Sequence, residues 1–194
     1  MIAETGLAAL WLAASLALLQ LVLALVGLKG DKPDLLAAVR PAAVAQGVLT
    51  AIAFALLITL FMRSDMSVLL VATNSHSAKP WLYKFAGTWG NHEGSMLLWV
   101  TVMGVAGAAV ALFERALRRD THMATLGGQA AISLGFYAFL LFSSNPFARI
   151  SPAPADGQGL NPCCKTPASP SIRPRSIWAM SASPSPFPSP SARC

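Results

Sequence analysis

Charged residues are scarce in this chain: Lys, Arg, Asp and Glu together make up 11% of its 194 residues. Soluble globular domains carry about 25% of these residue types. Hydrophobic residues make up 55% of the chain. A low charge content combined with a high apolar content excludes an ordinary soluble domain and favours a membrane protein.

Charge is absent altogether from four long stretches, and each reaches the ~20 residues that a helix needs to cross a hydrocarbon core of about 30 Å. The predicted helices cover residues 5–28, 41–62, 94–113 and 121–145. The stretches also lack the two-residue alternation of barrel strands. The sequence therefore predicts an all-α, polytopic membrane protein with four transmembrane helices.

Basic residues are absent before the first predicted helix, which is also longer than the roughly 7–15 apolar residues of a signal-peptide core. We therefore expect this helix to be retained. Basic residues gather in the first and third connections: Lys29, Lys32, Arg40, Arg115, Arg118 and Arg119. Short loops rich in Lys and Arg remain in the cytoplasm. The N-terminus and the connection over residues 63–93 are thus predicted to face the periplasm of a bacterial inner membrane.

Cysteine is absent before position 163, and residues 163–194 hold all three cysteines and half of the 14 prolines. This composition predicts a disordered, Ser/Pro-rich tail that is distinct from a transmembrane region over residues 1–162. No Cys-x-x-Cys pair occurs, so no metal or redox site is expected. The basic residues of the tail raise the net charge to +6. No basic face with interleaved aromatics accompanies them, which argues against a nucleic-acid partner.

One polar stretch stands at the mouth of the third predicted helix, where residues 88–99 read Thr-Trp-Gly-Asn-His-Glu-Gly-Ser-Met-Leu-Leu-Trp. Polar groups gather at such a position when they have a function, because deeper positions lose their water. The candidate site residues are Trp89, Gly90, His92, Glu93, Gly94, Ser95 and Trp99. Ser95 is expected to cap the helix, and Glu93 to favour the positive end of its dipole.

This run closely resembles the Trp-Gly-x-His-Glu-Gly-Ser-Leu-Leu-Leu-Trp signature of the CcmF-type heme lyases of cytochrome c maturation, with their nitrite-reductase and CcsA-like relatives. The resemblance covers nearly all of residues 1–162. It implies heme as the cofactor and covalent attachment of heme to apocytochrome c. The implied partners are a heme chaperone, other cytochrome c maturation subunits and apocytochrome c. In the family the iron-binding histidines lie further along, so the resemblance assigns this chain no catalytic or metal-binding residue. We do not expect the fragment to catalyse attachment alone.

Heme handling requires a flat apolar surface and a ligand for iron, which aromatic side chains and histidine supply. The predicted periplasmic connection and the helix that follows it offer Trp81, Tyr83, Trp89, His92 and Trp99. The alternative interpretation is an aromatic belt that anchors helix ends, with His92 and Glu93 solvated.

The tail has a second interpretation in the genetic code. Residues 163–170, back-translated with GC-rich codons and read one nucleotide earlier, give Leu-Leu-Gln-Asp-Pro-Gly-Leu-Ala. Continuing to residue 194 gives a His-Pro-Pro loop followed by an aromatic-rich apolar run. The amino-acid sequence read in this shifted frame resembles the sequence that follows an Asn-Pro pair in the CcmF-type family. We therefore expect a frameshift after Pro162, which would make the tail out of frame.

Small and amide side chains are candidates for contacts between helices. The small residues are Gly104, Ala106, Gly107, Ala108, Ala109, Gly127, Gly128 and Gly135. Trp11, Gln20, Gln46 and Gln129 are either helix contacts or lipid-facing anchors. His76 and His122 are expected to be surface loop residues.

Two other function classes compete with a heme lyase fragment. A small non-enzymatic membrane subunit would use the Trp-His-Glu loop to dock a partner, and capture of that partner with unaltered heme occupancy would favour this class. A transporter half would require charged groups at mid-helix depth. The predicted helices contain none.

Overall fold

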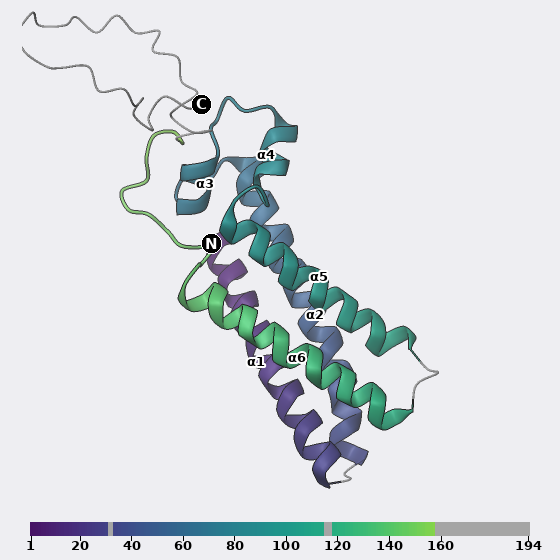
Figure 1. Cartoon of the computed structure of the whole chain (residues 1–194). Coiled ribbons are helices and arrows are strands. Elements are labelled where there is room, and N and C mark those ends of the chain that lie inside the picture. Colours follow the sequence, from purple (N-terminus) through teal and green to yellow (C-terminus); the bar gives the residue numbers. More distant parts are fainter. Residues whose placement is uncertain (31–32, 115–117, 158–194) are drawn as a thin grey trace, which may run out of the picture. The chain divides into compact units, whose positions relative to one another are not determined.

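Figure 1 shows a computed structural model of the chain, which describes residues 1–30, 33–114 and 118–157. Four long helices occur in these ranges: α1 (Ile2–Gly30), α2 (Pro33–Arg63), α5 (His92–Phe113) and α6 (Arg119–Phe142). Each is long and apolar enough to cross a membrane. The predicted all-α membrane fold with four spanning helices is confirmed. The predicted tail over residues 163–194 lies outside the described residues.

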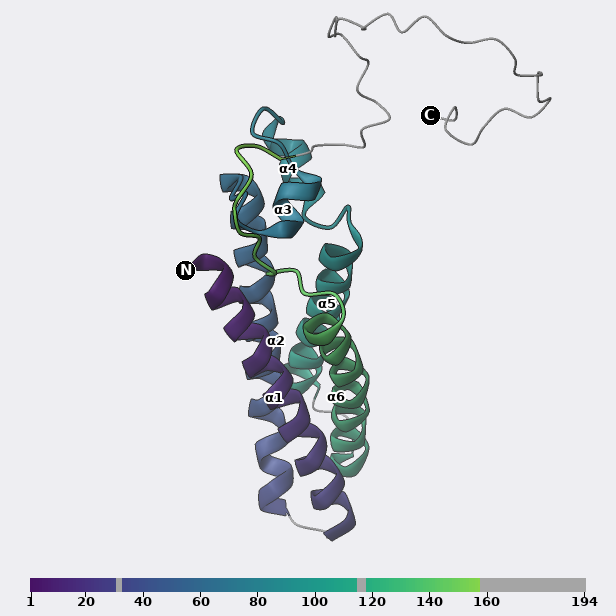
Figure 2. The same cartoon turned by 90° about the vertical axis from the view of Figure 1, so that its left-hand side faces the viewer.

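The four long helices lie side by side, and consecutive ones run in opposite directions (Figures 1 and 2). α1 packs against α2 and α6, α2 packs against α5, and α5 packs against α6. The larger core cluster includes Leu10, Leu57, Leu60, Leu97 and Tyr137. A smaller cluster, which includes Ala24, Val39, Ala43 and Leu126, lies toward the opposite end of the helices.

Amide side chains join the helices inside the bundle. Gln20 Nε2 donates to the Leu126 carbonyl at 2.7 Å, and Gln129 Nε2 donates to the Met103 carbonyl at 3.2 Å. Gln46 Nε2 lies 3.3 Å from the Tyr137 hydroxyl. Hydrogen bonds of this kind satisfy polar groups that lipid cannot satisfy. The three glutamines are therefore helix contacts.

Trp11 has a different environment from the three glutamines. It is 46% exposed, and its ring packs edge-on against Phe142 with the ring centroids 5.8 Å apart. Trp11 lies on the outer surface of the bundle.

Small residues bring α2 close to α5. A Cβ on Gly47 would lie 2.6 Å from the Gly104 carbonyl oxygen. Another close approach joins α5 to α6, where a Cβ on Gly107 would lie 2.7 Å from the Gln129 side chain. The prediction of close contacts is wrong for Gly128 and Gly135, since no atom lies within 4 Å of a Cβ placed on either.

Every helix end except the C-terminal end of α5 differs from the predicted one, by eight residues at the start of α2 and by one to three residues elsewhere. α2 begins at Pro33 rather than at residue 41, and Pro41 lies inside it. Proline is favoured as a first helical residue, and Asp34 suits the first turn. α6 ends at Phe142 rather than at residue 145, because a residue that precedes a proline, as Asn145 does, disfavours the α conformation.

The connection between α2 and α5 contains two short helices that were not predicted, α3 (Leu69–Asn74) and α4 (Trp81–Gly87). Residues 143–157 run from α6 back to this connection. Leu69 N donates to the Ala148 carbonyl at 2.8 Å, and Ile150 N donates to the Ser67 carbonyl at 3.0 Å.

The expectation that His122 is a surface loop residue is wrong. It lies in the first turn of α6 and is 5% exposed. His76 lies in the connection before α4 and is half-buried.

Candidate functional site

The signature residues lie where the chain turns into α5. Asn91 precedes the helix in an extended conformation, and its Oδ1 accepts a hydrogen bond from Gly94 N at 2.6 Å. Asn91 Nδ2 donates to the Gly87 carbonyl at 2.8 Å. The helix therefore starts at His92 and is capped by Asn91. The prediction that Ser95 caps it is wrong, since Ser95 Oγ donates to the His92 carbonyl.

Gly94 is required by a close backbone approach. It is buried, and a Cβ on it would overlap the carbonyl oxygen of Thr88. Thr88 is itself fully buried. The turn over residues 88–91 therefore packs directly on the first turn of α5 without an intervening side chain.

His92 joins this turn to α6. Its ring packs edge-on against Phe139, with the ring centroids 5.7 Å apart, and its Nδ1 lies 3.3 Å from Ser144 Oγ. No described group bonds to Nε2. If Nδ1 carries the proton and donates it to Ser144, Nε2 has a free lone pair. Such an orienting bond is what a ligating imidazole needs.

Two hollows flank this histidine. The first, of about 430 Å³, is lined mostly by residues of polar type: Leu69, Leu70, Thr73, Asn74, Asn91, His92, Glu93 and Asn145. The second, of about 330 Å³, is apolar and is lined by Met96, Ile132, Gly135, Phe136 and Phe139. His92 lines the first and contacts Phe139 of the second, so it marks the boundary between them.

The remaining signature residues separate in space. Glu93 is half-buried and lines the polar hollow. Trp99 is 62% exposed, and its seven-residue spacing from His92 places it on the same side of α5 about 10 Å along the axis. Trp89 packs edge-on against Phe85 of α4 at 4.8 Å. Gly90 is exposed beside it.

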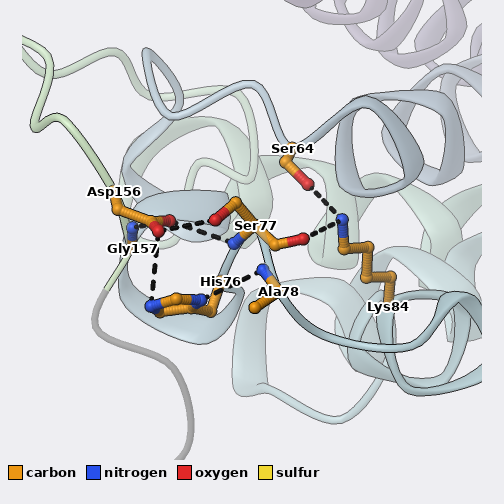
Figure 3. A network of polar contacts seen from close by, with 7 residues as sticks. All are labelled: Ser64, His76, Ser77, Ala78, Lys84, Asp156 and Gly157. Carbon is orange, nitrogen blue, oxygen red and sulfur yellow. Dashed lines mark hydrogen bonds and ion pairs between the residues drawn. The ribbon is translucent and has the colours of Figure 1, made fainter.

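A separate cluster of polar side chains joins residues 152–157 to the connection before α4 through hydrogen bonds and an ion pair (Figure 3). Asp156 accepts hydrogen bonds from the Ser77 hydroxyl at 2.6 Å and from Ser77 N at 3.0 Å, and His76 Nε2 lies 3.3 Å from the same carboxylate. Lys84 Nζ donates to Ser64 Oγ and to the Ser77 carbonyl. The Ser77 hydroxyl bond is the main reason that the pKa of Asp156 falls to about 2.

Sequence reasoning missed this cluster, because Ser77 and Asp156 are 79 positions apart and belong to no local motif. Among the described residues, no group of three or more His, Cys, Asp or Glu side chains could hold a metal ion.

Comparison with known proteins gives a consistent result, although no family model matches the chain. It is 48% identical over 167 residues to the cytochrome c-type biogenesis protein Ccl1 of Rhodobacter capsulatus, covering 86% of this chain and 26% of that protein. It is 46% identical over 162 residues to CycK of Bradyrhizobium diazoefficiens, covering 84% and 24%. It is 47% identical over 164 residues to CcmF of Pseudomonas aeruginosa, covering 84% and 25%.

A solved structure of a cytochrome c heme lyase CcmF matches with a TM-score of 0.72 at 23% identity, covering 76% of this chain and 25% of that one. This match supports the fold. The chain spans about a quarter of the length of the curated relatives that it matches. With identities of 46–48% across most of its length, the chain belongs to the family of cytochrome c-type biogenesis proteins that includes CcmF, CycK and Ccl1.

Proposed function

We propose that this chain takes part in cytochrome c biogenesis as the N-terminal membrane region of a heme-handling protein. The proposed location is a bacterial inner membrane, with the N-terminus and the His92 rim on the periplasmic side. The observation that carries the proposal is the placement of His92. Its Nδ1 is within reach of Ser144 Oγ, no described group bonds to its Nε2, and an apolar hollow begins at Phe139 beside it.

These residues suit one side of a heme. The apolar hollow and exposed Trp99 offer surface for a porphyrin, and His92 Nε2 offers one bond to iron. The other two imidazoles in the described ranges have different surroundings. His76 pairs with Asp156, and His122 lies at the other end of α6, about 25 Å along its axis. We infer that the remaining contacts come from other parts of a longer protein or from partners, namely a heme chaperone, maturation subunits and apocytochrome c.

Heme titration of the purified chain in detergent tests the role of His92. We expect ferric heme to bind with the absorption spectrum of an imidazole-ligated iron. His92→Ala should weaken binding by about tenfold or more, since substitutions around metal ligands already cost 10–100-fold. His76→Gln is the matched control, because that imidazole is engaged by Asp156. Equal loss in both variants would refute the role of His92.

Complementation tests the proposed inactivity of the fragment. In a strain that lacks its own full-length relative, the 194-residue chain should not restore c-type cytochromes, as judged by heme staining. Restoration would show that the fragment catalyses attachment alone.

Labelling tests the orientation. A single cysteine introduced as Gly90→Cys, with the native cysteines replaced by serine, should react with an impermeant maleimide in intact spheroplasts. Reaction only after lysis would place the His92 rim in the cytoplasm.

A further inference from the structure

A groove lies on the face formed by α2 and the end of α5, at the opposite end of the bundle from His92. Its volume is about 780 Å³, and its apolar lining includes Val44, Val48, Leu49 and Leu112. Arg40 also lines the groove. At 1.5 Å per residue the path from Arg40 to Leu49 is about 14 Å long. This length is close to half of a hydrocarbon core of about 30 Å, so the groove spans about one leaflet.

Arg40 is held at the end of this groove. Its Nε donates to the Ala111 carbonyl at 3.0 Å, which anchors the guanidinium against the end of α5. Within the part of the chain that the structure describes, no acceptor bonds to the two terminal nitrogens. A guanidinium that is held through Nε presents its two terminal nitrogens as parallel hydrogen-bond donors, and these match the oxygens of a phosphate.

The depth of Arg40 in the membrane suits such a ligand. Charged residues occur at this end of all four long helices: Lys29, Asp34, Glu114, Arg118 and Asp120. They mark the level of the lipid headgroups, because the spans between them and the other end carry no charge except Arg40, which lies about 9 Å further along α2 than Asp34. The groove therefore leads from the headgroup level at Arg40 into the hydrocarbon layer at Leu49.

We propose that this groove binds one acyl chain of an anionic phospholipid and that Arg40 binds its phosphate. Basic pockets between transmembrane helices are the usual form of such sites. Charge complementarity decides between occupants. An apolar helix would fill the groove but leave the guanidinium nitrogens without an acceptor, whereas an anionic lipid satisfies the charge and the apolar lining together.

Native mass spectrometry of the full 194-residue chain tests the proposal, with phosphatidylglycerol and phosphatidylcholine of identical acyl chains as probes. We expect retention of one phosphatidylglycerol molecule at concentrations where phosphatidylcholine is lost. Arg40→Gln should weaken phosphatidylglycerol binding about fivefold, as expected for one basic residue at the membrane surface. Lys29→Gln is the matched control, since Lys29 is an exposed cation at the same end and does not line the groove.

Ala45→Phe provides a second test, because it fills the groove and retains the charge. We expect it to abolish retention while the helical circular dichroism stays unchanged. Equal retention of the two lipids, equal losses for Arg40→Gln and Lys29→Gln, or full retention by Ala45→Phe would each overturn the proposal. A second copy of the chain seated in the groove in place of lipid would overturn it as well.

Discussion

Replacement of Gly94 by alanine tests whether the backbone contact before α5 holds the site together. A Cβ at this position would overlap the Thr88 carbonyl oxygen and lie 2.8 Å from Asn91 Oδ1. The Thr88 oxygen belongs to the backbone and cannot rotate away. The variant must therefore separate the turn over residues 88–91 from α5, which breaks the 2.6 Å bond from Gly94 N to Asn91 Oδ1.

The expected change in stability combines three contributions. Overpacking of a buried position costs about 1–3 kcal/mol. Loss of the Asn91 cap costs about 1 kcal/mol. Alanine recovers up to about 1 kcal/mol through its higher helix propensity. We therefore expect Gly94→Ala to lower the free energy of unfolding by about 1–3 kcal/mol.

Unfolding of the detergent-solubilised chain by SDS, followed by circular dichroism, measures this change. Gly128→Ala is the matched control, because no atom lies within 4 Å of a Cβ at that helical position. It should be neutral or stabilising by up to about 1 kcal/mol. The reasoning fails if both variants have the same free energy of unfolding, since the overlap with Thr88 would then have no consequence.

Three further predictions concern separate parts of the chain. The Asp156 carboxyl should titrate near pH 2 in ¹³C NMR, and titration near its ordinary pKa of 3.8 would contradict this. Because the pKa is lower in the folded protein, the stabilising effect of this carboxylate is complete above about pH 4 and is lost as the pH falls through 2. Gln20→Leu should change the SDS unfolding free energy by less than about 1 kcal/mol, since the bond lost to Leu126 is offset by removal of the buried, unpartnered Gln20 Oε1. DNA sequencing around the codon for Pro162 should reveal a single-base change that restores a long open frame, and an intact frame would end that hypothesis.

The four spans could be predicted from the sequence because lipid excludes charge, and the charge-free stretches are as long as a bilayer is thick. The same reasoning could not find the start of α2. Helices continue past the hydrocarbon core into water, where charged residues are tolerated, so α2 extends back through Arg40 to Pro33. At 1.5 Å per residue its 31 residues measure about 46 Å.

From the sequence, the candidate site could be predicted only as a continuous stretch of residues and not as an arrangement of side chains in space. The motif indicated His92 correctly as a residue at the helix mouth, but its contacts with Phe139 and Ser144 depend on how α6 packs against α5. Nothing local in the sequence encodes that packing. The same limit applies to the buried position of His122, which was expected to be a surface loop residue.

The contiguous signature contains two kinds of residue with different physical roles. Asn91 and Gly94 build the turn, because one caps α5 and the other admits the Thr88 backbone. His92 and Trp99 are exposed, and neither belongs to the buried core clusters of the bundle. Substitution of the first pair should therefore impair folding and function together. Substitution of the second pair should impair the proposed heme binding while the bundle remains stable, so stability measurements can separate the two roles within one motif.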